Sequence, residues 1–194
     1  MINKNSEVAV IGAGIAGATI AFHLAEMGVN VTLIEKEHPA AGPTGRSTAL
    51  CHLFYLMPEL SRLAQRGVDW LKRVPEFTDY QPVVHETGML WCVGEQNAAD
   101  WAEAVRRIRD DEGGEIEVLS PEEFSKIAPN FSVDGIALGV WEPSYGYADP
   151  YDATNAFVAA AGEKGATVLL HSRVSRLDIN SGKIHGVELE NGDR

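Results

Sequence analysis

The first part of the chain contains two short apolar runs that flank a longer helix-like segment. The first run, Val8–Ile11, is rich in β-branched residues and is typical of a strand buried on both faces. The helix-like segment continues to about Met27, and Gly28 stands where a helix end favours a residue that can adopt positive φ. The second run, Val31–Ile34, ends on Glu35. This pattern predicts a β-α-β unit.

The middle of the chain is predicted to alternate between strands and amphipathic helices. Pro58–Val74 has apolar residues at helical spacing, and Pro75 is expected to end this helix. The later elements are expected as a strand within residues 83–93, a helix over Ala98–Arg109, a strand over Ile116–Leu119, a helix capped by Ser120 and Glu123 that stops before Pro129, and a strand over Ile136–Trp141. Residues 79–147 therefore have the predicted order β-α-β-α-β.

The last part of the chain returns to the pattern of the first. Asp149 and Pro150 are typical of the cap and the first position of a helix, which is predicted to run to Gly162–Gly165. Ala166–His171 follows as an apolar run and is predicted to be a buried third parallel strand of the first sheet.

Two extended runs near the end of the sequence predict a hairpin. They are Leu177–Ile179 and Ile184–Glu190, and Ser181-Gly182 lies between them. Asn191-Gly192 is a further hairpin signal, but no strand follows it in this sequence. We therefore expect the chain to be truncated relative to a complete fold.

The composition is that of an ordinary soluble globular domain, with 45% apolar and 23% charged residues. The net charge of −12, from 16 basic and 28 acidic residues, argues against nucleic acid or an anionic membrane as a partner. No apolar run reaches the length of about 18 residues that a membrane span needs. The cysteines and histidines have no metal-ligand spacing, so we expect no metal site and free thiols in a cytoplasmic protein.

A glycine-rich motif joins the first strand to the first helix and predicts dinucleotide binding. We call it the glycine loop, and its residues are Gly12, Ala13, Gly14, Ile15, Ala16 and Gly17. Gly12 permits the tight turn, Gly14 lets a diphosphate approach the amides at the helix start, and Gly17 lets the helix pack closely on the strand. The alternative is a β-α-β unit that binds nothing. A signal peptide is disfavoured, because three glycines interrupt the apolar segment.

The acid at the end of the second strand supports this prediction. Glu35 follows the glycine loop at about the 20-residue spacing at which a carboxylate accepts the hydroxyls of an adenosine ribose. A 2′-phosphate would meet this carboxylate as a like charge, which argues against NADP.

A second cluster of small polar residues lies downstream of a loop rich in Pro, Gly and Ala. Thr44, Gly45 and Ser47 are typical of a helix N-terminus, and Arg46 adds a fixed cation for a phosphate or carboxylate. The alternative is a surface cap with a solvated arginine.

Together these motifs resemble the N-terminal half of the D-amino-acid-oxidase-type FAD oxidoreductases, which include glycine and sarcosine oxidases, D-amino-acid dehydrogenases and dimethylglycine dehydrogenases. The resemblance implies that the glycine loop holds the FAD diphosphate and that Glu35 and Lys36 hold the adenosine ribose. It also implies that Arg46, Ser47 and Thr48 begin a helix beneath the flavin. The backbone of Val174 is expected to contact the adenine.

The resemblance implies an α/β fold with two domains. Residues 1–78 and 148–194 are expected to form an incomplete Rossmann-like FAD-binding domain, with a parallel sheet, helices and a β-meander. Residues 79–147 are expected to form part of an α+β substrate-binding domain inserted into it. The chain then corresponds to about half of an enzyme, and it could be a truncated gene product or one subunit of a split protein.

The reaction implied by the resemblance is hydride transfer from the Cα–H of a small amine or amino acid to flavin N5, followed by hydrolysis of the imine. His52 and Tyr55, on the expected helix, are the candidates for substrate contact, although packed core residues are the alternative for each. A second hypothesis is a non-catalytic subunit that needs a partner chain to complete the flavin site. We expect a homo-oligomer or a complementing second half. An NAD-dependent dehydrogenase is the weaker third option, because it would continue with alternating strands and helices.

Overall fold

The β-α-β unit expected at the start of the chain is present in the computed structural model, which describes residues 5–193. Strands β1 (Val8–Ile11) and β2 (Val31–Ile34) are parallel, and helix α1 (Ile15–Glu26) connects them. A third parallel strand, β9 (Thr167–Leu169), pairs with β2, so that the sheet order is β1-β2-β9. The predicted third parallel strand is therefore confirmed.

The middle strand of this sheet is buried along its whole length, but the outer strands are not. All residues of β2 are buried, whereas β1 alternates between half-buried and exposed side chains and β9 is half-buried. Val10 faces α1, since a Cβ on Gly17 would lie 3.5 Å from its side chain, and Ala9 and Ile11 therefore face the other side. The expectation of burial on both faces is wrong for these strands, because helices cover one face only among residues 5–193.

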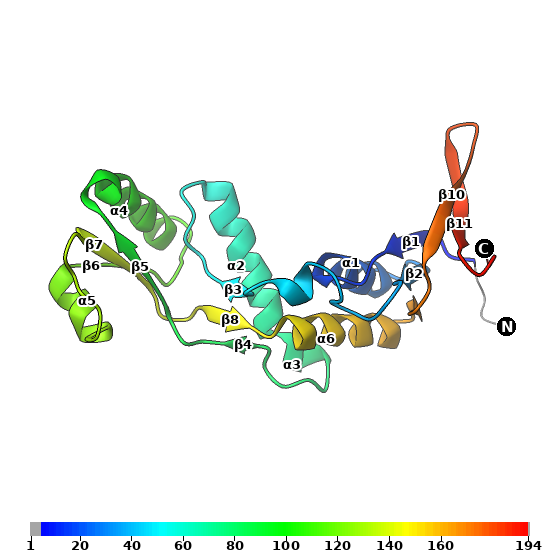
Figure 1. The fold of residues 1–194 in the computed structure, drawn as a ribbon, viewed down its shortest axis with the longest axis horizontal. Helices are drawn as coiled ribbons and strands as arrows, with labels where there is room; N and C mark the ends of the chain where they lie inside the picture. The colour runs from blue at the N-terminus through cyan, green and yellow to red at the C-terminus, as the bar shows by residue number, and fades with distance from the viewer. Residues whose placement is uncertain (1–4, 194) are drawn as a thin grey trace. The chain divides into compact units, whose positions relative to one another are not determined.

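Helices α1 and α6 (Pro150–Glu163) cover one face of the sheet and pack against each other through small side chains (Figure 1). Their buried residues are mostly alanines: Ala18, Ala21 and Ala25 in α1, and Ala153, Ala156, Ala160 and Ala161 in α6. Short helix α3 (Val74–Phe77) adds Phe77 to an aromatic cluster with Phe22 and Phe157. The ring centroids are 4.9 Å apart for Phe22 and Phe77 and 5.6 Å apart for the other two pairs.

The hairpin expected near the end of the sequence is formed by β10 (Val174–Asn180) and β11 (Lys183–Leu189). Both turn residues adopt positive φ, 50° at Ser181 and 76° at Gly182. Two successive residues with positive φ define the type I′ turn, whose twist matches that of the flanking strands. The turn residues were therefore identified correctly from the sequence.

A second set of elements has the predicted order β-α-β-α-β. Strands β5 (Met89–Val93), β7 (Leu138–Glu142) and β6 (Glu117–Leu119) form an antiparallel sheet in the order β5-β7-β6, with helices α4 (Glu95–Asp110) and α5 (Pro121–Ile127) between them in sequence. A smaller sheet has the order β3 (Leu50–Cys51), β8 (Gly146–Ala148) and β4 (Val84–His85), and helix α2 (Pro58–Lys72) precedes β4 in sequence. The capping box of Ser120 and Glu123 is present as predicted.

The described residues divide into two units. The first unit comprises residues 5–49, 74–83 and 149–193, and the second comprises residues 50–73 and 84–148. Compared with the expected bounds, residues 50–73 and 148 group with the second unit, and residues 79–83 group with the first. No helix among residues 5–193 is both long and apolar enough to cross a bilayer.

The helix expected to begin near Gly45 is absent, which corrects the sequence-based expectation. Thr44–Arg46 form a single 3-10 turn, η1, and Ser47 is already extended. The chain then enters β3, whose backbone groups pair with β8 instead of with a helical turn. Residues 52–57, which we call the ring segment, belong to no helix or strand, and Pro58 disfavours a helical conformation of the residue before it.

The N-terminal cap of α6 provides a test of how helix capping stabilises the first unit. The Asp149 side chain accepts hydrogen bonds from the amides of Tyr151 at 2.8 Å and Asp152 at 2.9 Å. We expect Asp149→Ala to lower the free energy of unfolding by about 1 kcal/mol, because two amides lose their acceptor. Asp149→Asn retains a capping oxygen and should cost much less. Urea denaturation followed by circular dichroism measures both, and an equal loss in both variants would contradict the capping role.

Candidate nucleotide-binding site

The backbone requires a glycine at positions 12 and 17 of the glycine loop, and Gly14 faces the side chain of Thr44. Gly12 adopts a φ of 99°, and its amide donates to the Ile34 carbonyl at 2.7 Å, which joins the loop to the end of β2. A Cβ on Gly17 would lie 1.9 Å from the Gly12 carbonyl oxygen, and a Cβ on Gly14 would lie 3.0 Å from Thr44 Oγ1. The roles predicted for Gly12 and Gly17, a tight turn and close helix packing, therefore have a direct steric basis.

The N-terminus of α1 has the properties of an anion site. Its cap residue, Gly14, provides no side-chain acceptor, and the first turn contains no acidic residue. The first amides of a helix have no intrahelical partner, and they carry the positive end of the helix dipole. A diphosphate is the kind of group that such amides bind at the end of a parallel strand.

Glu35 lies beside the glycine loop and is tied to it. Its side chain is largely buried, since the residue is 8% exposed. One carboxylate oxygen, Oε2, accepts from the Ala13 amide at 2.8 Å, and Oε1 accepts from the Glu37 amide at 2.8 Å. A carboxylate has about four acceptor positions, so each oxygen retains capacity for one more donor. The residue is therefore arranged to receive two further hydroxyl groups.

The loop after Glu35 folds back over the glycine loop. The Ala40 amide donates to the Ala13 carbonyl at 2.9 Å, and the Ile15 amide donates to Thr44 Oγ1 at 3.2 Å. Ala40 adopts a φ of 61°, and its carbonyl accepts from the Gly45 amide at 3.0 Å. Thr44 is a site residue that the sequence did not indicate individually, because its contact with α1 depends on how the intervening loop closes.

The other residues expected at the site have less definite positions. Arg46, Ser47 and Thr48 are exposed, and Arg46 forms no ion pair within residues 5–193. Lys36 pairs with Glu37 at 3.4 Å. The chain that leads to Val174 passes Glu35, because the Ser172 amide donates to the Glu35 carbonyl at 2.8 Å.

His52 and Tyr55 lie together in the second unit, within the ring segment and not on a helix, which corrects that expectation. We call them the ring pair: their rings stack with centroids 4.7 Å apart, and the Tyr55 hydroxyl lies 3.4 Å from His52 Nε2. Trp91 contacts the His52 ring edge-on at 5.0 Å. Nothing in the geometry of the ring pair itself requires a substrate, so its role stays a prediction.

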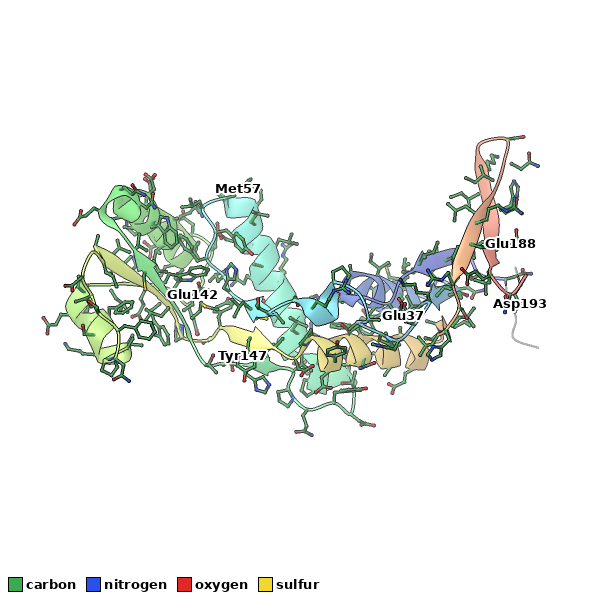
Figure 2. The ribbon with its side chains drawn as sticks, in the orientation of Figure 1. Glu37, Met57, Glu142, Tyr147, Glu188 and Asp193 are labelled. Carbon is green, nitrogen blue, oxygen red and sulfur yellow. The ribbon has the colours of Figure 1, made fainter. Side chains whose placement is uncertain are left out.

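A buried carboxylate adjoins the ring segment, and sequence analysis missed it. Glu142 is fully buried at the end of β7 (Figure 2). It accepts hydrogen bonds from the Leu53 amide, from the Phe54 amide at 3.3 Å and from Trp91 Nε1 at 2.6 Å. Burial raises the pKa of Glu142, because it disfavours the charged form, and the three donors partly oppose this effect. A single acid in an apolar strand gives no sequence signal of these partners.

Residues 7–194 match the family described as FAD dependent oxidoreductase, DAO. The chain belongs to this family. FAD is the cofactor of the family, and the glycine loop and Glu35 have the geometry to accommodate its diphosphate and ribose. The family resemblance and the FAD dependence expected from the sequence are therefore confirmed.

The curated relatives of the chain are longer proteins. Human mitochondrial dimethylglycine dehydrogenase is 25% identical over 188 residues, which cover 96% of this chain and 22% of that protein. The anaerobic glycerol-3-phosphate dehydrogenase subunit A1 of Haloferax volcanii is 30% identical over 190 residues, which cover 97% of this chain and 32% of that protein. The chain thus spans about a fifth to a third of these relatives.

The structure is also similar to solved structures of the family. L-proline dehydrogenase from P. horikoshii matches with a TM-score of 0.88 and 30% sequence identity, over 97% of this chain and 50% of that chain. The predicted fold class, an α/β fold of this family, is confirmed by this similarity.

Gly17 provides a test of the loop geometry. We expect Gly17→Ala to destabilise the first unit by about 1–3 kcal/mol, because the new methyl group would overlap a backbone oxygen that is fixed by the turn. Gly42→Ala is the matched control in the adjoining loop, since a Cβ there meets nothing within 4 Å. Urea denaturation measures both variants. An alanine at position 17 that unfolds like wild type would contradict the close packing of α1 on the loop.

Proposed function

We propose that this chain provides the nucleotide-binding and part of the substrate-binding region of an FAD-dependent enzyme that oxidises a C–N bond of an amino acid or amine. The observation that carries the proposal is the position of Glu35, whose carboxylate is fixed against the glycine loop and retains free acceptor positions. The relatives that act on dimethylglycine and L-proline support the substrate class.

In this proposal, the first unit holds the cofactor. The amides of the glycine loop that do not already donate within the described residues, those of Gly14, Ala16 and Gly17, bind the diphosphate, together with the hydroxyl of Thr44 and the free guanidinium of Arg46. The free acceptor positions of Glu35 receive the ribose hydroxyls, and Lys36 adds a positive charge beside it. Thr48 offers a further donor, as does Ser47 once its hydroxyl leaves the Thr44 carbonyl to which it donates at 2.7 Å, and the backbone of Val174 contacts the adenine. Of the expected FAD-binding domain, residues 1–78 and 148–194, the part within the first unit then holds the cofactor, whereas residues 50–73 belong to the second unit.

The second region, residues 79–147, acts as part of the substrate-binding domain in this proposal. When bound, FAD supplies the acceptor for the hydride that leaves the carbon next to nitrogen. The residues of this chain orient the substrate, and His52 and Tyr55 offer an aromatic surface with polar edges for that purpose. The alternative is a non-catalytic subunit whose flavin site is completed by a partner chain or by a second copy.

Glu35 makes nucleotide selectivity a specific test. We expect the chain to bind ADP and FAD, and to bind ADP bearing a 2′-phosphate much more weakly, because that phosphate would face a carboxylate. Glu35→Gln should weaken ADP binding by about tenfold or more and reduce this discrimination, since charge-assisted hydrogen bonds are lost. Calorimetric titration measures both ligands.

The matched control for that experiment is Glu163→Gln. Glu163 is an exposed acid at the end of α6 in the same unit, and its side chain makes no contact with the glycine loop, Glu35 or Lys36 in the described part of the chain. This variant should therefore bind ADP like wild type. An unchanged affinity in Glu35→Gln, in protein whose circular dichroism is native, would remove the basis of the proposed ribose contact.

The substrate class is tested by adding candidate substrates to the FAD-loaded chain without oxygen. We expect a dimethylated or N-methyl amino acid, or L-proline, to bleach the visible absorbance of the oxidised flavin. Glycerol 3-phosphate is the comparison compound, because one relative is a glycerol-3-phosphate dehydrogenase subunit. Bleaching by glycerol 3-phosphate alone would contradict the amine assignment. Flavin that binds and stays oxidised with every compound would favour the non-catalytic alternative.

A further inference from the structure

The ring segment is held by side chains from two other elements of the second unit. At its N-terminal end, the Leu53 and Phe54 amides donate to the Glu142 carboxylate on β7. At its C-terminal end, the Tyr55 and Leu56 carbonyls accept from the Arg107 guanidinium on α4. The segment belongs to no helix or strand, so these contacts replace the hydrogen bonds that regular structure would provide.

The Glu142 contacts fix the segment in a defined place on the sheet. One oxygen, Oε2, accepts from both amides, and the other, Oε1, accepts from the Trp91 indole on β5. Burying a carboxylate without hydrogen-bond donors costs much free energy. The Glu142 carboxylate is therefore stable at this buried position only with N–H donors such as these three. Because Trp91 also contacts the His52 ring, the carboxylate positions both the backbone of the segment and the surface against which His52 rests.

The Arg107 contacts use the planar geometry of the guanidinium. Its two terminal nitrogens each lie 3.0 Å from one carbonyl oxygen, Nη1 from Leu56 and Nη2 from Tyr55. Its Nε lies 3.5 Å from Glu112 Oε1, and the Glu112 side chain is only 5% exposed. Ser61 Oγ donates to the Tyr55 carbonyl as well, at 3.0 Å, so the Leu56 carbonyl is the contact that depends most on Arg107.

The ring pair has few polar contacts of its own. His52 Nδ1 is buried and has no hydrogen-bond partner in the described part of the chain, and the contact of its Nε2 with the Tyr55 hydroxyl is long at 3.4 Å. The orientation of the two rings therefore depends on the backbone that carries them.

We infer that Glu142 and Arg107 are positioning residues that together hold the ring segment so that the ring pair is stacked and fixed. This inference rests on the proposed function only where it treats the ring pair as a surface for substrate. The arrangement itself follows from the contacts of the second unit, and it can be tested without cofactor or substrate.

The titratable groups around Glu142 make its protonation a usable signal. His52, on the ring segment, acts on Glu142 as a nearby positive charge when protonated. Tyr145 lies on the β7–β8 connection. Burial raises the pKa of Tyr145 to about 12, and the negative charge of Glu142 also contributes to this increase. Tyr145 is therefore neutral while Glu142 titrates, and His52 is the other nearby charge that the experiment must account for.

The test is nuclear magnetic resonance of the full 194-residue chain labelled with nitrogen-15. We expect the chemical shifts of the Leu53 and Phe54 amides and of the Trp91 indole N–H to change together with pH, because all three donate to Glu142. Their shared midpoint should lie above the ordinary pKa of a glutamate. Histidine ring signals, recorded in the same samples, identify any step that belongs to His52. In Glu142→Gln the shared titration should disappear. The ring-current shifts of His52 and Tyr55 that stacking causes should also decrease.

The second arm changes the other contact. Arg107→Lys retains the charge but cannot donate to two carbonyls in the same plane, so we expect partial loss of the Tyr55 ring-current shift. Glu117→Gln, an exposed acid on β6, and Arg106→Gln, an exposed arginine on α4, are the matched controls and should change neither signal. All variants are compared by the dispersion of signals from β6 and α5, which belong to the same second unit but lie outside the ring segment, because these signals report whether that unit is folded.

Two outcomes would overturn the inference. The first is a folded Glu142→Gln variant in which the His52 and Tyr55 ring signals are unchanged. The second is an Arg107→Lys variant with a wild-type Tyr55 signal. If the ring signals change as expected but substrate does not reduce the flavin, the positioning role stands and the proposed function of the ring pair fails, so the two failures are distinguishable.

Discussion

The hydrogen bond from the Ala13 amide to the Glu35 carboxylate is the interaction on which the nucleotide site depends. It joins the glycine loop to the end of β2, and the Glu37 amide holds the other oxygen of the same carboxylate. The carboxylate is therefore fixed before any ligand arrives, so little ordering remains for ribose binding. Preorganised acceptors of this kind bind more tightly, because their conformational entropy has already been lost on folding.

This arrangement also explains why small residues are concentrated in the first unit. Gly17 brings α1 within contact of the Gly12 carbonyl, and the alanine faces of α1 and α6 allow the two helices to approach each other closely. The close approach positions the start of α1 directly over the end of β1, where the unpaired amides converge. The packing of the helices and the geometry of the anion site are thus consequences of one steric constraint.

Local sequence patterns were sufficient for most elements, including the β-α-β unit, the capping box at Ser120 and the turn at Ser181-Gly182. They were insufficient where the partner of a residue lies far along the chain. The segment after Thr44 was expected to be helical from its hydroxyl residues, but pairing of β3 with β8 satisfies its backbone groups instead. The contacts of Glu142 with the ring segment span almost ninety residues, which no local pattern can reveal.

Both units use a carboxylate at the end of a strand to hold the backbone amides of a loop, and the difference between the two carboxylates indicates their different roles. Glu142 is fully buried and receives three donors. Glu35 remains 8% exposed and receives two, one on each oxygen. Because a carboxylate can accept about four hydrogen bonds, Glu35 retains a free position on each oxygen beside the unpaired amides of α1. Glu142 also keeps one acceptor position, on Oε1, but the residue is fully buried. The same chemical device therefore leaves a partly exposed carboxylate in the first unit, as the proposed ribose contact requires, and a fully buried one in the second.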